Sequence, residues 1–450
     1  MKTEKKNDMT VRRIVCLLFV IVIGAFAGVM VVLFKWAASH VIHLSELCYH
    51  YVWTHPGGLP VLIFAVIMLG WAASKTAKIL GNCSGGGIPT AIAAIRGLIR
   101  FDWLKNLFVV FVYAMVTYLG GVPLGNEGPS VQMGTAVGKG IFEWGAKRRL
   151  IIGDYTGWQR KMMLVGASAG FAAATCSPFT GILFAFEEAH HKCTVRMVVH
   201  VSFGVMAAIF TSQTLGRMFG ISGRLFEFVV KDTMKIHELW AAVLVGIVCG
   251  CFAILFTKMH GIVGGWVRVH LAEMSPTAQK CSVFAAVAVI GFMFPEVTGS
   301  GHHLIEALLE GKSLWQMLIL CLFLRAIFLV VANNMGITGG LFVPTLAMGA
   351  MIGAICARPL ADAGRISQEA VPTLIIVGTV AFLAAASHIP KMAVLLAIEA
   401  FSGLLYFLPA LLGIGFAYAV VNIGKAEDFS ELVVERKAEA ARKENEVCGK

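Results

Sequence analysis

Charged residues are scarce in this sequence, and their scarcity excludes a soluble protein of this size. Asp, Glu, Lys and Arg make up 14% of the 450 residues, hydrophobic residues make up 58%, and the mean hydropathy is +0.79. A chain of this length folded in water needs more charge to cover its surface. Uncharged or nearly uncharged runs such as Ile14–Ala38 and Leu239–Phe256 are compatible with the ~20 residues that cross a hydrocarbon core as a helix. We therefore expect an all-α polytopic membrane protein.

The sequence also lacks the patterns that hold metals, disulfides or nucleic acids. Its eleven cysteines lie mostly within apolar runs, and neither CxxC nor HExxH occurs. Cysteines placed in this way are typical of small buried side chains. The net charge is +11, but no aromatic residues interleave the basic ones as a nucleic-acid groove would require. We expect no cofactor, no metal and no nucleic-acid partner, and we assign the positive charge to membrane topology and anionic lipid.

Basic residues gather near both ends of the chain, at 2–13 and 436–443. Lysine and arginine beside membrane spans favour the cytoplasmic side, so both termini are predicted to be cytoplasmic, in the inner (plasma) membrane of the cell. The apolar run that starts at Ile14 is longer than a typical signal-peptide core. We therefore interpret it as an uncleaved first helix.

Internal similarity divides the chain into two halves, roughly residues 10–215 and 225–425. The segment Gly125–Gly138 aligns without gaps on Gly340–Gly353, with identical glycine, proline and methionine positions. Two further pairs keep the same order: 84–87 with 298–301, and 172–187 with 384–399. Ordered repeats of this kind indicate duplication. The periodicity does not decide whether the halves run parallel or inverted.

These halves predict one membrane domain at residues 11–423, preceded by a short N-terminal segment at 1–10. Residues 424–450 form a charged cytoplasmic tail whose signs alternate. This pattern is typical of a solvated helix, and the tail is too short to form a regulatory domain.

Three glycine-rich stretches interrupt the apolar sequence, at Gly85–Pro89, Gly120–Pro129 and Gly336–Pro344, and a helix-compatible run follows each. Irregular backbone inside a bilayer is tolerated only where it is buried in protein or lines a cavity. A helix that begins there presents free N–H groups and the positive end of its dipole. The alternative is that the glycines only permit close helix packing. Three interruptions of the apolar sequence, related by the repeat, favour a small-anion site built from backbone N–H donors.

Glu127 stands inside the second of these stretches, between Gly125 and Pro129. A carboxylate at membrane depth costs ~2.5–3.5 kcal/mol and is a functional residue by default. When ionised it can occupy the anion site itself, and protonation would release it, so that one residue would gate the path and carry a proton. The alternative is a capping glutamate. Its repeat partner is apolar Phe342, so the halves share a scaffold but not this chemistry.

Taken in order, these motifs resemble the anion-binding motifs of the CLC family of chloride channels and anion/proton antiporters. The similarity covers nearly all of the chain and continues through Ala167–Gly170 and Gly181–Phe184 to Glu187-Glu188. It implies an inverted-repeat bundle of tilted and partly spanning helices, and a homodimer with one pathway in each subunit. The anion-binding residues that it predicts are Gly85, Gly86, Gly87, Ile88, Pro89, Gly125, Asn126, Gly128, Pro129, Gly340, Leu341 and Phe342.

The resemblance also implies two proton-transfer residues. Glu127 matches the external gating glutamate, and Glu188 matches the internal glutamate of proton-coupled members. Glu188 alone could instead be a helix-end carboxylate in an ion pair. Its presence favours exchange of a halide for protons, with a passive voltage-gated chloride channel as the alternative.

The chain departs from the family pattern at three places. Gly86 stands where a serine usually contacts the anion, Asn126 stands where a basic residue usually precedes the glutamate, and Phe429 and Ser430 fall where a tyrosine is common. These losses are similar to those of the fluoride-exporting branch, although that branch often has methionine at the place of Gly86. Chloride and fluoride therefore both stay open as the transported anion.

Other classes of function would depend on specific residues. Gly166–Gly170 matches the G-x-S-x-G pattern of serine hydrolases around Ser168, but that motif requires a preceding strand. Metal transport would use His190, His191 and Cys193 with His302-His303, yet adjacent histidines do not face one helical site. A purely structural or receptor-like protein would make no use of Glu127. We expect no enzyme activity.

Overall fold

The computed structural model describes residues 2–148, 155–189, 194–226, 234–270, 273–311, 315–401 and 403–448. The helices of the first half are α1 (Lys2–Thr54), α2 (Leu59–Leu80), α3 (Gly87–Ile95), α4 (Trp103–Leu119), α5 (Glu127–Lys147), α6 (Tyr155–Thr175), α7 (Pro178–Phe184) and α8 (Val195–Met218). Those that follow are α9 (Leu239–His270), α10 (Pro276–Met293), α11 (His302–Leu309), α12 (Trp315–Asn334), α13 (Phe342–Asp362), α14 (Ala370–Ala386), α15 (Pro390–Ala400), α16 (Phe407–Ile423) and α17 (Phe429–Cys448).

Short turns of helix connect several of these elements: η1 (Pro56–Gly58), η2 (Gly81–Cys83), η3 (Ala185–Ala189), η4 (Ile236–Glu238), η5 (Pro295–Val297) and η6 (Leu404–Tyr406). Several helices start on a proline, which has no N–H to leave unpaired and whose φ suits the first turn. Pro178 begins α7, and the repeat-related Pro390 begins α15. Within the described ranges the backbone forms isolated bridges but no strand.

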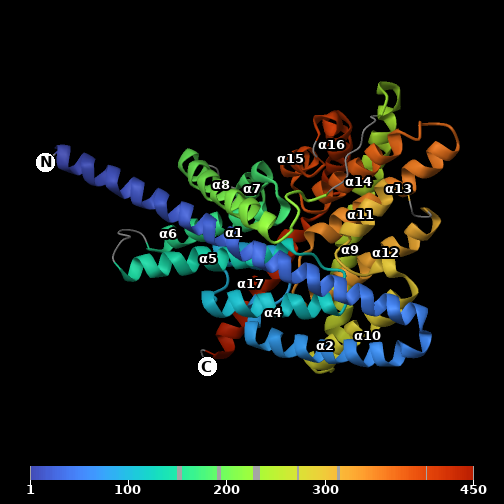
Figure 1. Cartoon of the computed structure of the whole chain (residues 1–450), viewed down its shortest axis with the longest axis horizontal. Coiled ribbons are helices and arrows are strands. Elements are labelled where there is room, and N and C mark those ends of the chain that lie inside the picture. The colour runs from blue at the N-terminus through green and yellow to red at the C-terminus, as the bar shows by residue number, and fades with distance from the viewer. Residues whose placement is uncertain are drawn as a thin grey trace.

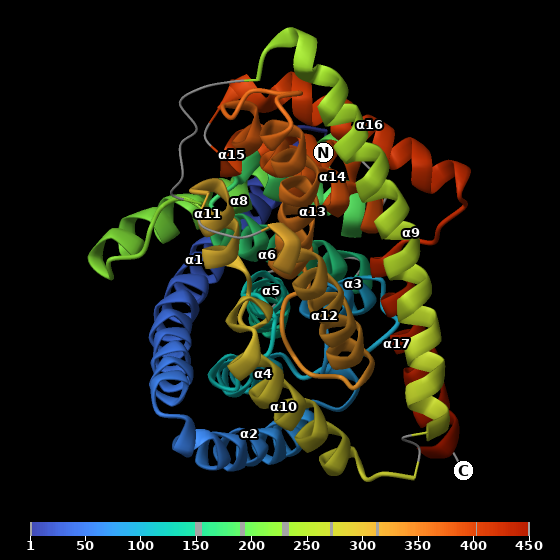
Figure 2. The same cartoon turned by 90° about the vertical axis from the view of Figure 1, so that its right-hand side faces the viewer.

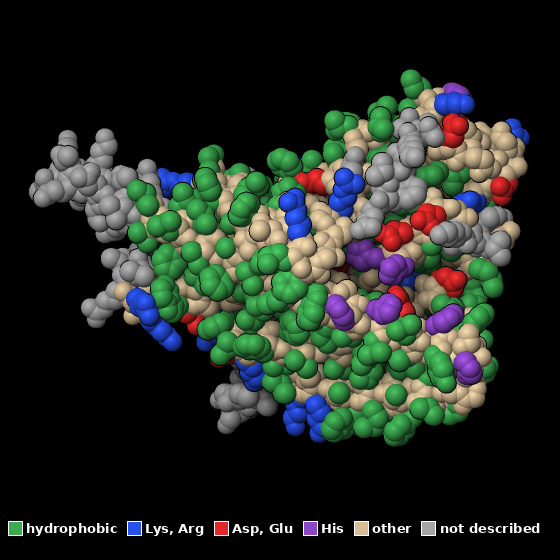
Figure 3. Space-filling view, in the orientation of Figure 1, with side chains coloured by type: hydrophobic (Ala, Val, Ile, Leu, Met, Phe, Trp, Pro, Cys, Tyr) green, Lys and Arg blue, Asp and Glu red, His purple; other side chains and the backbone are tan. Residues whose placement is uncertain are grey.

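Eight helical segments of the described chain are long and apolar enough to cross a membrane. Many of their large apolar side chains point outward, and they cover much of the face seen in Figure 3. Such exposure on a soluble protein would be a liability, whereas lipid accommodates it. The prediction of an all-α polytopic membrane protein is confirmed.

The longest helix, α1, runs along the whole molecule, and α2 and α10 lie beside each other at one edge (Figures 1 and 2). The part of α1 that qualifies as a candidate membrane span covers 41 residues, Ile14–Thr54. A single crossing needs only ~20 residues. This helix must therefore be steeply tilted or extend beyond the hydrocarbon layer. In Figure 2, α5, α12 and α13 lie in the middle of the view with α1, α2 and α9 around them.

Two repeat-related glutamates each cap the start of a helix in the opposite half of the chain. The Glu187 carboxylate accepts from the N–H groups of Lys391 and Met392, at 3.0 and 2.6 Å, where α15 begins. Glu399 accepts from the N–H groups of Phe179 and Thr180, at 2.9 and 2.8 Å, where α7 begins. Each carboxylate thus satisfies donors that a helix start leaves unpaired. Equivalent contacts made in both directions require a two-fold relation between the halves, which a simple translation would not give.

Glycines bring neighbouring helix backbones into direct contact in both halves. A Cβ added to Gly134 of α5 would overlap the carbonyl oxygen of Gly166 in α6. Its repeat partner Gly349 of α13 faces Gly378 of α14 in the same way, and a Cβ there would overlap the Gly378 carbonyl oxygen. Small residues at such crossings give close van der Waals packing where lipid removes the hydrophobic drive for helix association.

Replacing Gly134 by alanine is expected to destabilise the protein by roughly 1–3 kcal/mol, because α5 and α6 must move apart. The measurement is thermal unfolding of the purified protein in detergent. Gly265→Ala in α9 is the matched control, since a Cβ there meets no atom within 4 Å. Equal melting temperatures for the two variants would contradict this packing argument.

The prediction of a solvated helical tail is wrong for one face of α17. Phe429, Val433 and Val434 are 2%, 5% and 1% exposed. Arg96 of the loop after α3 also pairs with Glu431 of α17, with Nη1 at 2.6 Å from Oε1. The three residues stand at positions i, i+4 and i+5 of the helix, so a single stripe faces the core while the charges face outward. The tail helix is therefore part of the packed structure.

Candidate functional site

The three glycine-rich stretches meet in the middle of the fold. Gly125 and Gly340 pair antiparallel, each donating its N–H to the carbonyl oxygen of the other at 2.7 Å. Gly86 pairs with Gly339. The hydroxyl of Tyr118 also donates to the Gly125 carbonyl, at 2.7 Å. These bonds place the starts of α3, α5 and α13 side by side.

Glycine is required where these helix starts touch. A Cβ on Gly87 would overlap the carbonyl oxygen of Gly128, and a Cβ on Gly128 would lie 2.7 Å from the Cα of Gly340. A side chain at either position would force the backbones apart. The close approach therefore brings the free N–H groups of three helices to one region.

Each of the three helix starts offers two N–H groups that make no bond within its helix. The first hydrogen bond within each helix is donated by the N–H of Thr90 in α3, Ser130 in α5 and Thr345 in α13. The acceptors are the carbonyl oxygens of Gly86, Asn126 and Leu341, respectively. The residue just before each donor is a proline, which has no N–H. The remaining first-turn donors are Gly87, Ile88, Glu127, Gly128, Phe342 and Val343. Together with three helix dipoles they favour negative charge.

Glu127 begins α5 at this meeting point and is 1% exposed. Its Oε2 has no hydrogen-bond partner among the described residues. That oxygen lies 2.6 Å from where a Cβ on Gly125 would be, and Oε1 lies 3.7 Å from Nε2 of His302. The carboxylate thus lies beside the free N–H groups with one oxygen unpaired. Its repeat partner Phe342 instead packs its ring against the ring of Phe171, with the ring centroids 5.0 Å apart.

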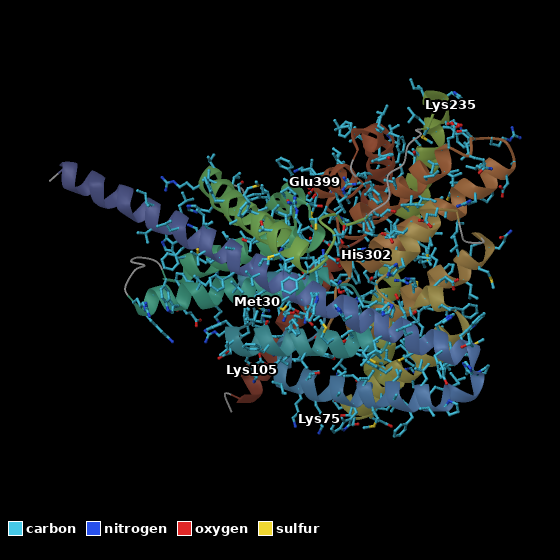
Figure 4. The ribbon with its side chains drawn as sticks, viewed as in Figure 1. Met30, Lys75, Lys105, Lys235, His302 and Glu399 are labelled. Carbon is cyan, nitrogen blue, oxygen red and sulfur yellow. The ribbon has the colours of Figure 1, made fainter. Side chains whose placement is uncertain are left out.

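A cavity of about 570 Å³ reaches the segment that leads into Glu127. Tyr118 and Leu124 line it near the site, and Glu46, His50 and His303 line it farther out. His303 is within 3.8 Å of Glu46, so histidine and carboxylate side chains face each other there. Figure 3 shows histidine and acidic side chains around a hollow on this face, and Figure 4 places His302 near the middle of the molecule. Titratable groups therefore extend from this hollow towards Glu127.

Glu188 lies on the π-helical turn η3, outside the eight apolar spans, and is 6% exposed. Its Oε1 accepts from the hydroxyl of Ser430 at 3.2 Å, and its Oε2 has no partner in the described structure. Desolvation raises the pKa of Glu188 to about 8, and the like charge of Asp428 acts in the same direction. Burial also raises the pKa of Asp428 to about 7. Two adjacent carboxyls thus retain a proton near neutral pH.

A second cavity, of about 230 Å³, shares no lining residue with the first. Ser84 and Gly336 line it where the first and third stretches enter the site, and Arg436 and Lys437 of α17 add positive charge. Lys437 Nζ donates to the carbonyl oxygen of Ser84 at 2.5 Å. Two cavities thus approach the helix starts. One is lined by the segment before α5, and the other is lined by the segments before α3 and α13.

Comparison with known proteins decides the family. Residues 63–422 match the family described as "Voltage gated chloride channel". The chain belongs to this family. It is 26% identical over 397 residues to the H(+)/Cl(-) exchange transporter ClcA of Klebsiella pneumoniae (strain 342), an alignment covering 85% of this chain and 80% of that one.

Two solved structures of antiporters share the fold. A slow cyanobacterial Cl⁻/H⁺ antiporter has a TM-score of 0.83 at 22% identity, covering 94% of this chain and 98% of that one. A CLC-type fluoride/proton antiporter has a TM-score of 0.71 at 18% identity, covering 90% and 94%. The expected CLC-like inverted-repeat bundle is confirmed.

Within this family frame, the structure sorts the predicted anion-binding residues into two groups. Gly87, Ile88, Gly128 and Phe342 carry free first-turn N–H groups. Val343, which the sequence reasoning missed, has the same position in α13 as Ile88 and Gly128 have in their helices.

The second group lies before or between these donors, and five of its members have N–H groups that are engaged or missing. The N–H of Gly85 donates to Thr338 Oγ1 at 3.1 Å, and Gly125 and Gly340 bond to each other. Pro89 and Pro129 have no N–H. Gly86, Asn126 and Leu341 are the N-cap residues, and Asn126 Oδ1 is buried without a partner among the described residues.

The place of the family tyrosine is occupied by two residues with different contacts. The Phe429 ring packs against Phe256 and the ring of His260, with centroids at 4.9 and 4.8 Å. Ser430 instead donates to Glu188. The hydroxyl at this place is therefore directed at the Glu188 carboxyl.

The structure bears on two alternative functions, a serine hydrolase and a metal transporter. Ser168 lies inside α6, flanked by glycines that pack against α5, and not on a strand-to-helix turn. The nucleophile-elbow interpretation is therefore wrong for this serine. His302 and His303 contact carboxylates, whereas His190, His191 and Cys193 lie outside the described residues.

Proposed function

We propose that this chain exchanges a small halide, chloride or fluoride, for protons across the membrane. The observation that carries the proposal is the position of Glu127, buried beside three helix starts with one carboxylate oxygen unpaired. An ionised carboxylate competes with a halide for the same N–H groups. Protonation removes that competition, so each proton taken up opens the site to an anion.

The anion is held by the first-turn N–H groups of α3, α5 and α13. Backbone donors and helix dipoles bind negative charge without a buried cation, which suits a path that must also release its ion. His302, at 3.7 Å from Glu127, is placed to exchange protons between the outer cavity and the gate. Glu188 passes protons at the other end.

A passive chloride channel is the runner-up. The observation against it is the burial of Glu188 together with its contacts to α17: a channel has no need for a carboxyl kept protonated near neutral pH. The family relationship and the similarity to exchange transporters agree with exchange.

Sidedness and assembly belong to the same proposal. We place both termini on the cytoplasmic side of the inner (plasma) membrane. Residues 11–423 form the membrane domain, between a short N-terminal segment and the tail at 424–450. We assign the assembly as a homodimer with one path in each subunit, surrounded by lipid.

Purified protein in liposomes tests the proposed function. Vesicles are loaded with the potassium salt of fluoride or chloride, and a potassium ionophore is added so that potassium can leave together with the halide. Ion-selective electrodes follow the concentration of each halide and the external pH. The proposal expects one of these halides to leave while protons enter in a fixed ratio. Efflux of neither halide would overturn it.

Asp428→Asn provides a pH test of the inner carboxyl pair. Asparagine still accepts the N–H of Ser430 that Asp428 binds at 2.7 Å, but it removes the like charge that raises the pKa of Glu188. The pKa of Glu188 should fall, so the pH at which proton transport from this side is half-maximal should fall by roughly one unit. Proton flux measured against pH on that side reads this directly, with exposed Glu439→Gln as control. An unchanged midpoint would contradict the assignment.

A further inference from the structure

We propose that the side-chain amide of Asn333 on α12, held in place by His260 on α9, forms a halide subsite beside Gly86. This amide supplies a donor that the chain lacks on α3 and α17. The subsite rests on the proposed function and adds the contacts that would hold the ion on the α17 side of the helix starts. Its evidence is the position of the buried His260 and the half-buried Asn333, their unpaired atoms and the cavity that they line.

The amide of Asn333 lies where a side chain at position 86 would point. A Cβ added to Gly86 would be 3.2 Å from Asn333 Oδ1. Asn333 is at the end of α12, just before the turn that leads to Gly339 and Gly340. The amide thus approaches the start of α3 from the neighbouring helix, and it occupies the space that the absent side chain leaves.

His260 holds this amide from the other side. Its Nε2 lies 3.0 Å from Asn333 Nδ2, and the imidazole is 1% exposed. The imidazole ring packs at nearly a right angle to the ring of Phe429, with ring centroids 4.8 Å apart. His260 therefore lies next to the residue that replaces the family tyrosine, as Asn333 lies next to the glycine that replaces the family serine.

Two polar atoms of this pair lack partners in the described structure: Asn333 Oδ1 and His260 Nδ1, both buried. Leaving such atoms unpaired costs free energy, so they indicate a missing partner. The oxygen and nitrogen of an amide exchange places by a half-turn, and the imidazole proton moves between its nitrogens. With the proton on Nε2, His260 donates to the Asn333 oxygen. The amide N–H₂ then faces Gly86 as a donor for an anion.

The surroundings favour negative charge. Both side chains line the 230 Å³ cavity, which also contains Arg436 and Lys437 and has no carboxylate among its lining residues. Arg436 Nη1 donates to Asn334 Oδ1 at 2.7 Å, so this cation is fixed at the cavity wall. A halide leaving the helix starts would enter a positively charged cavity, with the neutral amide of Asn333 where the cavity approaches Gly86.

The test compares halide binding and efflux for the wild-type protein and three variants. Asn333→Ala removes the donor, and Asn333→Asp keeps the shape but places a negative charge at the subsite. Each is expected to weaken halide binding, measured by calorimetry with sodium fluoride and sodium chloride, by about tenfold or more. Gly86→Ser combined with Asn333→Ala returns a hydroxyl to α3 in the space vacated by the amide, and is expected to recover part of the lost affinity.

Thermal unfolding of each variant shows that it is folded, and Asn422→Ala, at an exposed end of α16, controls for the substitution itself. Unchanged binding and an unchanged fluoride-to-chloride ratio in folded Asn333→Ala would overturn the subsite while wild-type transport left the proposed function intact. Absence of halide binding and flux in the wild-type protein would overturn both.

Discussion

Replacement of Glu127 by glutamine is expected to abolish proton transport while halide flux continues. Glutamine keeps the shape of the side chain but neither carries a proton nor competes as an anion for the N–H groups of α3, α5 and α13. Proton transfer by a positioned side chain typically contributes 10²–10⁴-fold, so proton flux should fall by about 100-fold or more. Parallel recordings of pH and halide concentration outside proteoliposomes measure both fluxes.

A second consequence follows from the gating role. Halide flux through the Glu127→Gln protein should lose its dependence on pH at the side of the outer cavity, because no group is left at the gate to protonate. Exposed Glu273→Gln is the control for the same chemical change. Proton coupling that survives in Glu127→Gln would remove this residue from the mechanism and favour a capping role.

Glu188→Gln is expected to stop proton movement for a different reason. The amide oxygen of the substituted side chain still accepts the Ser430 hydroxyl that lies 3.2 Å from Glu188 Oε1, so η3 and α17 should stay packed. Without the carboxyl, however, no proton reaches the interior from the α17 side, and proton flux should again fall by about 100-fold or more. The halide path does not pass through this side chain, so halide flux should persist.

The two variants are distinguished by their response to pH. Glu188→Gln retains the carboxyl of Glu127 and should therefore keep the dependence of halide flux on pH at the outer cavity, which Glu127→Gln should lose. Measuring halide efflux over a range of external pH separates them. Identical pH profiles would contradict the assignment of an outer gate and an inner proton donor. Proton flux at the wild-type rate in Glu188→Gln would mean that this residue is a structural carboxylate.

The sequence predicted the scaffold well because the repeat carries it. The alignment of Gly125–Gly138 on Gly340–Gly353 corresponds to α5 and α13, which meet the same glycine-rich crossings in α6 and α14. Glycine and proline at these points have few structural alternatives. The location of Glu127 followed from its place between them.

Contacts between distant segments were beyond the sequence reasoning. The reciprocal capping by Glu187 and Glu399 depends on how the halves dock, which periodicity does not record. Asn333 and His260 are 73 positions apart, and neither belongs to a motif. Burial and unpaired atoms reveal them, and a sequence contains neither.

The tail helix shows a signal that was present but outweighed. Phe429, Val433 and Val434 have the spacing of one helical face, whereas the surrounding charges favoured a solvated interpretation. Packing of that face brings Ser430 to Glu188 and Lys437 to Ser84. A short apolar stripe in a charged helix thus positions residues at the end of the proposed path.

The most direct test of the central claim is uphill proton movement in liposomes. Wild-type protein is reconstituted with the membrane potential clamped near zero by potassium and valinomycin, a halide gradient is imposed, and internal pH is followed from an initially equal value. Halide and proton exchange predicts that protons move against their developing gradient, in the direction opposite to the halide, and that Glu127→Gln abolishes this movement. Halide flux with no proton movement in the wild-type protein would contradict the account and identify a channel.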